Sequence, residues 1–211
     1  MFPSISRRRS IGPPCIQVWP PVCPCRRRPA RQYANRDDIE TQTGRYVDVR
    51  RPCAEDIDVR DIAHALSLQC RFNGHVREFY SVAEHCLRVA DHLPKPLRVH
   101  GLLHDAAEAY LGDIVTPVKR RLFGFAGLEN GMLRAIYVHL GVPWPSRKER
   151  ALVKQADIRA LREEAYGLLP SRGIWHIDSE PLMPERPLLC LAPYAARALW
   201  LQALGDELSQ T

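Results

Sequence analysis

The stretch GLLHDAAEAYLGD, residues 101–113, combines the apolar pattern of a packed helix with side chains that bind metals or move protons. One side of its helical wheel is apolar and carries Leu102, Leu103, Ala106 and Tyr110. The other side carries His104, Asp105 and Glu108, where an exposed helix would normally carry Lys and Glu. Gly101 lies beside them, although glycine costs about 1 kcal/mol relative to alanine inside a helix. The stretch therefore predicts a helix with a packed side, a chemically active side and a close neighbour at Gly101.

Helical periodicity recurs along most of the chain. The sequence predicts helices over residues 56–70, 81–93, 97–111, 127–140, 146–168 and 194–208, and a short one from Thr116. We expect residues 43–52 to be a short extended piece, residues 71–80 a loop and residues 170–190 irregular. No strand pattern is long enough for a sheet, so the predicted fold class is an all-α bundle.

Two of these helices open with the capping-box pattern Ser-x-x-Glu, in which two side chains satisfy each other's backbone N–H groups. The pattern pairs Ser81 with Glu84 and Ser146 with Glu149. In the long helix that follows Ser146, the expected interior residues are Leu152, Ala156, Ala160 and Leu161.

The basic charge of the chain lies at its N-terminal end. The net charge is +6, and eight of the 30 Lys and Arg fall within residues 1–36, which hold no acid. In the rest of the chain the 24 acidic residues outnumber the basic ones, so the core is not expected to attract nucleic acid. Residues 1–38 are also Pro-rich and aperiodic, which predicts a disordered tail before one domain over residues 39–211. A transit peptide, or non-native sequence upstream of the start, is the alternative for this tail.

The remaining composition favours a soluble, cytoplasmic protein. No apolar run approaches the roughly 18–20 residues that a membrane span requires. The seven Cys lack the spacing of a disulfide framework or a zinc module, which favours reduced thiols.

Two further polar residues, His85 and Asp157, stand beside apolar helical stripes. Each alone is more simply explained as a core histidine or a buried ion pair. A buried carboxylate must be paired, hydrogen-bonded or metal-bound, because burying a bare charge is prohibitive. Together with His104 and Asp105 they form a set of two imidazoles and two carboxylates on three predicted helices. Such a set predicts a site for one divalent transition metal.

The order His…His-Asp…Asp resembles that of the HD-domain metal-dependent phosphohydrolases. The blocks SVAEHCLRVA, LLHDAAEAYLGDIVTPVKR and VKQADIRALREEA are most similar to the bacterial 5′-deoxynucleotidase-like group, and the resemblance extends over about residues 40–170. It implies an all-helical HD fold with one divalent metal ion, which would be Co, Mn, Zn or Fe, with Mg as a further option. The implied metal ligands are His85, His104, Asp105 and Asp157.

The resemblance also implies roles for residues around the metal. Glu108 matches an acid that acts on the attacking water or the phosphate, and Asp113 matches a second acid near the scissile phosphate. Arg71 and Lys119 match basic residues that hold the phosphate of the substrate. Without the resemblance, Lys119 could be a solvated helix residue and Asp113 a cap of the next turn. The alternative partners of Arg71 would be Asp61 and Glu78.

The chain departs from the deoxynucleotidases in the loop before His85. Phe72 stands where those enzymes have a Trp that shapes the sugar pocket, and only 18 residues separate His85 from His104. These departures predict a remodelled pocket. In the same loop, His75 and Arg77 are expected to contact the substrate.

The implied function is hydrolysis of (deoxy)nucleoside 5′-monophosphates to nucleoside and phosphate. A triphosphohydrolase acting on deoxynucleoside triphosphates would use the same four ligands and is the alternative enzyme. The Arg-rich tail offers a different class, a nucleic-acid-associated protein with a degenerate HD domain. Dimers are common in the resembling group, so a homodimer is a further expectation.

Overall fold

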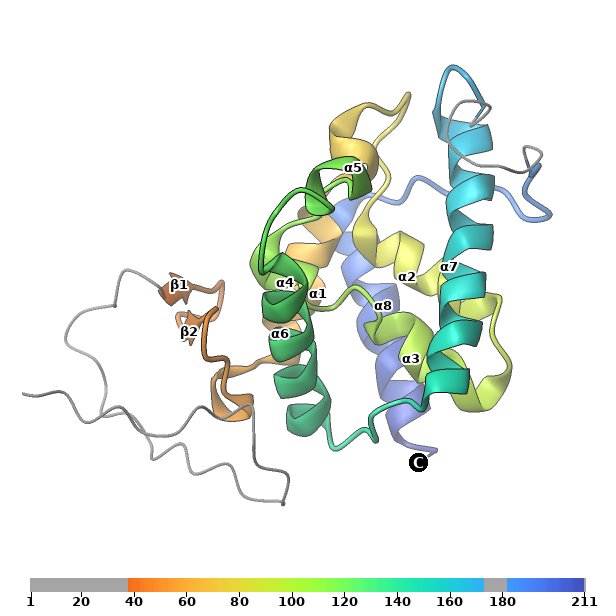
Figure 1. Ribbon diagram of the computed structural model, residues 1–211. Helices are drawn as coiled ribbons and strands as arrows, with labels where there is room; N and C mark the ends of the chain where they lie inside the picture. Colours follow the sequence, from red (N-terminus) through yellow and green to blue (C-terminus); the bar gives the residue numbers. More distant parts are fainter. Residues whose placement is uncertain (1–37, 173–181, 211) are drawn as a thin grey trace, which may run out of the picture.

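The computed structural model describes residues 38–172 and 182–210, which are mostly helical (Figure 1). The helices are α1 (Val59–Leu68), α2 (Val82–Asp91), α3 (Arg98–Leu103), α4 (Glu108–Leu111), α5 (Thr116–Lys119), α6 (Phe125–Leu140), α7 (Arg147–Leu168) and α8 (Pro193–Leu208). Single 3-10 turns are η1 (Ala54–Asp56), η2 (Arg71–Gly74) and η3 (Lys95–Leu97). The helical content confirms the predicted fold class. Apart from Asp38, the predicted disordered tail lies outside the described residues, as do residues 173–181 of the segment predicted to be irregular.

The prediction that no sheet forms is wrong, because strands β1 (Asp38–Glu40) and β2 (Tyr46–Asp48) pair antiparallel. Ile39 lies opposite Val47, which is fully buried in the core. The sheet is two short strands beside the bundle, too short for a period-2 pattern to reveal it. The extended piece predicted over residues 43–52 is confirmed for β2.

The core forms where α8 crosses the bundle and packs against α1, α2 and α3 (Figure 1). Trp200 of α8 is fully buried, and its Nε1–H donates to the carbonyl of Leu102 at 3.2 Å. No helix in the described ranges is both long and apolar enough to cross a membrane.

Helix α7 runs along the edge of the bundle and is fixed to α2 by a small apolar cluster (Figure 1). The cluster consists of Val89, Leu93, Leu97, Val153, Ala156 and Ala160. The capping box of Ser146 and Glu149 is confirmed in both directions. The predicted burial of Leu152 is wrong, because α7 packs along the Val153 stripe and leaves Leu152 44% exposed.

The helix predicted over residues 97–111 is not continuous, because a turn at residues 104–107 separates α3 from α4. His104 Nδ1–H donates to the carbonyl of Gly101 at 2.7 Å, and this carbonyl is the acceptor that Asp105 N–H would use in an unbroken helix. The chain then winds through tighter bonds, with Glu108 N donating to the carbonyl of Asp105 at 2.9 Å. The break places His104 and Asp105 in the turn between α3 and α4.

The close neighbour expected at Gly101 is the backbone of α2. A Cβ atom on Gly101 would lie 2.8 Å from Ala90 Cα and 2.9 Å from Ala90 N. The glycine therefore lets α3 approach α2, the helix that carries His85.

The capping box predicted at the start of α2 is only half formed. Ser81 Oγ accepts from Glu84 N at 3.1 Å, as expected. The Glu84 carboxylate accepts instead from three backbone N–H groups of a distant segment, at 3.0, 3.1 and 2.7 Å. These donors are Leu189, Cys190 and Leu191. Glu84 thus ties the segment before α8 to α2.

Changing Glu84 to Gln is expected to lower the free energy of unfolding by about 1–2 kcal/mol, because a neutral amide has one acceptor oxygen for three N–H groups. Urea denaturation measures the change. Glu149→Gln, at an exposed cap of α7, is the matched control and should change stability by less than about 0.5 kcal/mol. Equal effects in the two variants would contradict the tethering role of Glu84.

Candidate metal centre

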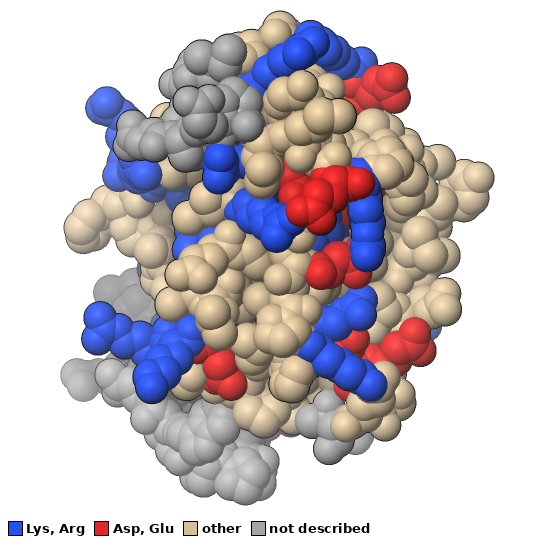
Figure 2. Space-filling view, turned by 90° about the vertical axis from the view of Figure 1, so that its right-hand side faces the viewer, with Lys and Arg blue, Asp and Glu red and all other residues tan. Residues whose placement is uncertain are grey.

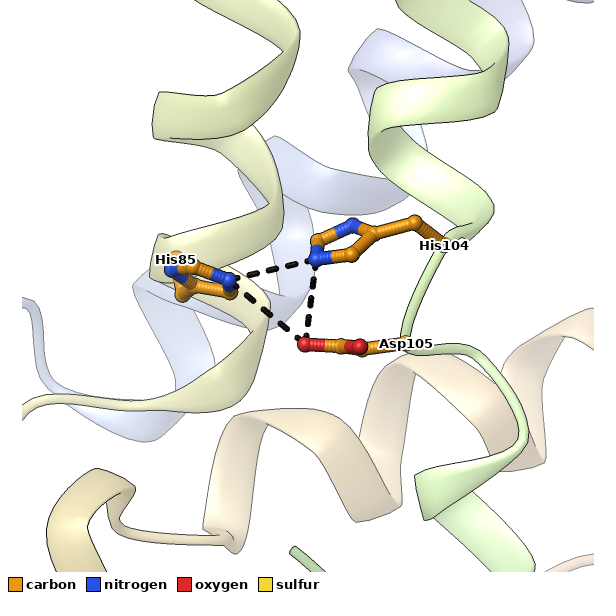
Figure 3. Close-up of side chains that lie close together, drawn as sticks. All are labelled: His85, His104 and Asp105. Atoms are coloured by element: carbon orange, nitrogen blue, oxygen red, sulfur yellow. Dashed lines mark hydrogen bonds and ion pairs between the residues drawn. The ribbon is translucent and has the colours of Figure 1, made fainter. Parts of the chain in front are cut away.

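His85, His104 and Asp105 point toward one another from neighbouring parts of the bundle (Figure 3). His85 lies on α2, and the other two lie on the turn between α3 and α4. The Nε2 atoms of the two histidines are 3.2 Å apart. Asp105 Oδ2 is 3.5 Å from Nε2 of His85 and 3.1 Å from Nε2 of His104. The three ligating atoms lie within 4.8 Å of one another, so this cluster could hold a metal ion.

Asp157 approaches the same cluster from α7. Its Oδ1 lies 3.3 Å from Nε2 of His85 and 3.9 Å from Nε2 of His104. Lys154 Nζ binds the other oxygen, Oδ2, at 2.6 Å and so leaves Oδ1 directed at the histidines. The structure therefore brings together all four residues that the sequence predicts as metal ligands.

Hydrogen bonds behind the two imidazoles decide which nitrogen carries the hydrogen. Nδ1 of His104 lies 2.7 Å from the carbonyl oxygen of Gly101, which can only accept, so Nδ1 is the donor. Nδ1 of His85 lies 2.8 Å from Oε1 of Glu164, an acceptor when ionised. The two Nε2 atoms then face each other beside the oxygens of Asp105 and Asp157. Acceptors this close repel one another unless positive charge lies among them, which is either a proton held on an Nε2 atom or a divalent transition metal, the ion that this donor set suits.

The charges of the cluster keep its carboxylates ionised. Burial lowers the pKa of His104, but the adjacent Asp105 carboxylate outweighs burial and raises this pKa well above its ordinary value. Burial raises the pKa of Asp105, whereas His104 and His85 hold it below its ordinary range. The same opposition holds the pKa of Asp157 low, through its hydrogen bond with His85. Both carboxylates are thus ionised at neutral pH, as metal ligands must be.

Glu164 is a residue of the site that the sequence reasoning missed. It is fully buried on α7, where Oε1 accepts from His85 and Oε2 accepts from Arg71 Nε at 3.2 Å. Burial raises the pKa of Glu164, but His85 and Arg71 hold it below its ordinary value. The sequence does contain a signal, because Glu164 follows Asp157 by seven residues, or two helical turns, and so shares its face of α7.

Arg71 reaches the cluster, where it pairs with Glu164 and Asp105 and not with Asp61 or Glu78, the alternative partners named from the sequence. One terminal nitrogen lies 3.1 Å from Glu164 Oε2, and the other lies 3.9 Å from Asp105 Oδ2. Asp61 instead accepts from the backbone N and the hydroxyl of Thr43, at 2.8 and 2.7 Å.

Glu108 and Lys119 meet beside the cluster. Lys119 Nζ lies 3.2 Å from Glu108 Oε1 and 2.7 Å from Oε1 of Glu129, a partner that no sequence pattern indicated. The other Glu108 oxygen, Oε2, is buried and has no hydrogen-bond partner among the described residues. Burial, with the nearby charges of Asp105 and Asp113, raises the pKa of Glu108 to about 9. Burial also raises the pKa of Asp113, against the opposing effect of the Arg71 charge.

The predicted substrate loop forms a strained turn next to Arg71. Phe72 and Asn73 both have left-handed backbone angles, with φ of 54° and 55°, and residues other than glycine hold such angles only when their surroundings impose them. The guanidinium of Arg71 lies 5.6 Å from the centre of the Phe72 ring. The side chains of His75 and Arg77 are exposed, so their contact with substrate stays a prediction.

Relatives of this chain share its sequence over most of its length. YfdR of Escherichia coli is 32% identical over 170 residues, which cover 80% of this chain and 94% of YfdR. The chain belongs to the YfdR family. It also matches a protein of Rhodobacter capsulatus, 37% identical over 135 residues, which cover 58% of this chain and 68% of that protein. Both relatives are named as uncharacterized proteins, and no family model matches the chain.

This member of the YfdR family also has a pocket of about 730 Å³ away from the cluster, between α2, α7, α8 and residues 185–191. Its charged residues pair with one another, as Arg88 does with Glu163 at 2.6 Å and Arg159 with Glu185 at 2.7 Å. Figure 2 shows basic and acidic side chains interleaved on the face that carries α7. The lining includes none of the four predicted ligands, so we place the candidate site at the histidine cluster and not at this pocket.

Proposed function

We propose that this chain is an HD-domain, metal-dependent phosphohydrolase that releases phosphate from (deoxy)nucleoside 5′-monophosphates. One observation carries the proposal: two imidazoles with fixed Nδ1–H groups direct their Nε2 atoms, 3.2 Å apart, at the same point as two carboxylates. This arrangement favours a cation at its centre. Acidic and basic side chains that could serve phosphate ester hydrolysis lie around it, which supports a hydrolase.

The surrounding cations would hold the phosphate. When bound, a divalent metal would offset the negative charge of the ester and make a water more acidic. Lys119, which lies between Glu108 and Glu129, supplies a positive charge beside the cluster. The Arg71 nitrogen nearest Asp105, at 3.9 Å from Oδ2, would donate to a phosphoryl oxygen.

Glu108 is the group best suited to proton transfer. Its buried Oε2 has no partner among the described residues, and its raised pKa of about 9 keeps a proton on it at neutral pH. A protonated carboxyl can donate to the departing alkoxide of the nucleoside. Asp113, on the adjoining loop, would orient the attacking water.

Changing Glu108 to Gln is expected to lower kcat by about 10²–10³-fold, because the amide keeps the contact with Lys119 but cannot deliver the proton. The metal content should stay that of the wild type, since Glu108 is not among the four ligands. Phosphate release and elemental analysis of the same preparation measure the two quantities. A kcat within about threefold of the wild type would remove Glu108 from the chemistry.

The test of the proposed function is a screen of nucleoside mono- and triphosphates with Co²⁺, Mn²⁺, Zn²⁺ and Mg²⁺, with the products separated by chromatography. We expect phosphate and nucleoside from a 5′-monophosphate. Release of triphosphate from a deoxynucleoside triphosphate would favour the triphosphohydrolase instead. Metal-loaded protein that hydrolyses none of these nucleotides would contradict the proposal.

A further inference from the structure

Arg71 directs the Nε side of its guanidinium at Glu164. Nε and one terminal nitrogen lie 3.2 and 3.1 Å from Glu164 Oε2, and Arg71 is only 8% exposed. An arginine grips a phosphate with two parallel hydrogen bonds only through a free edge of the guanidinium. In Arg71 the edge formed by Nε is already occupied.

Glu164 uses its two oxygens for two different partners. Oε1 accepts from His85 Nδ1 at 2.8 Å, while Oε2 accepts from Arg71. Both Glu164 and His85 are fully buried, so this carboxylate links the η2 turn, α7 and α2 inside the protein. A carboxylate that binds the far nitrogen of a metal-ligating histidine fixes the tautomer and the orientation of the ring.

We infer that Glu164 is a positioning residue that holds the His85 Nε2 atom ready for metal, and that Arg71 acts first as the anchor of Glu164. The inference rests on the proposed metal-dependent function. It changes the role of Arg71, which the family resemblance describes as a phosphate ligand. An ionised carboxylate accepts on both oxygens, whereas an amide accepts on one side and donates on the other. Glutamine at position 164 can therefore serve His85 or Arg71, but not both.

Glu163 provides a matched control, because it is the neighbouring residue on α7 and is equally buried. Its carboxylate accepts from Arg88 at 2.6 Å, Arg159 at 3.2 Å and His92 at 3.1 Å. None of these partners belongs to the histidine cluster. Glu163→Gln thus removes a buried charge from the same helix without touching the proposed metal ligands.

The experiment measures Mn²⁺ affinity by titration calorimetry, without substrate, for the full-length wild type and for Glu164→Gln, Arg71→Gln and Glu163→Gln. We expect the first two variants to bind Mn²⁺ roughly 10–100-fold more weakly, and Glu163→Gln to stay within about twofold of the wild type. The visible spectrum of the Co²⁺-loaded proteins gives a second readout, which should change in the first two variants only. Thermal melting verifies that each variant is folded, and Arg71→Gln carries the test if Glu164→Gln does not fold.

The outcomes separate this inference from the proposed function. Unchanged Mn²⁺ affinity in Glu164→Gln and Arg71→Gln, in a protein that binds metal and hydrolyses nucleotides, would overturn the inference alone. A rise in KM for Arg71→Gln with unchanged Mn²⁺ affinity would return Arg71 to the role of phosphate ligand. A wild type that binds no metal would overturn both proposals.

Discussion

Replacing Asp105 with alanine is expected to abolish metal binding and to lower phosphate release by about 10³-fold or more, which is roughly 4 kcal/mol of activation free energy. The reason is geometric. Oδ2 of Asp105 lies 3.5 and 3.1 Å from the Nε2 atoms of His85 and His104, so it is in contact with both histidine ligands. Without it, the two Nε2 atoms face each other with one carboxylate, that of Asp157, beside them. Elemental analysis and phosphate release, measured on the same preparation, test the prediction.

The control for Asp105→Ala is Asp61→Ala, at a buried aspartate outside the cluster. Asp61 lies on α1, is 4% exposed and accepts from Thr43, away from the cluster. This variant should lose stability but retain metal. Metal at 100 times its Kd should stabilise the wild type and Asp61→Ala by about 2.7 kcal/mol, and Asp105→Ala not at all. Wild-type metal content and rate in Asp105→Ala would refute the metal site.

The features that could be predicted from the sequence depend on residues close together in the chain. Ser146 and Glu149 form the expected capping box because both partners of each hydrogen bond lie within one turn. The candidate ligands His85 and Asp157 could be selected because helical periodicity places each beside an apolar stripe, where a polar group needs a reason to be buried.

The features that could not be predicted depend on partners far away in the sequence. The Glu84 carboxylate accepts from N–H groups more than 100 residues further along the chain, and Glu164 lies 79 positions after His85. A local pattern carries no information on which of two competing hydrogen-bond partners a side chain takes. The break before α4 has a different, local origin, because the His104 ring takes the carbonyl of Gly101 that the backbone of a regular helix would use, and helical periodicity does not show this competition.

Changing Gly101 to alanine is expected to destabilise the protein by about 3 kcal/mol, although alanine is the better helix former by about 1 kcal/mol. The added Cβ would lie 2.8 Å from Ala90 Cα and 2.9 Å from Ala90 N, which are backbone atoms that cannot turn aside. Helices α2 and α3 would have to separate. His85 precedes Ala90 on α2 and His104 follows Gly101 directly after α3, so their Nε2 atoms would move apart and Mn²⁺ binding would weaken as well.

Gly127→Ala is the control for this prediction, and it should change the stability of the protein in the opposite direction. Gly127 lies in α6, and a Cβ there meets nothing within 4 Å, so alanine should stabilise the protein by about 0.5–1 kcal/mol through helix propensity. Urea denaturation of both variants, with Mn²⁺ titration of each, measures the pair. If Gly101→Ala were as stable as Gly127→Ala and bound Mn²⁺ as tightly, the contact of α3 with α2 would not set the spacing of the two histidines. If only Gly101→Ala loses both stability and metal, helix packing and metal affinity depend on the same contact.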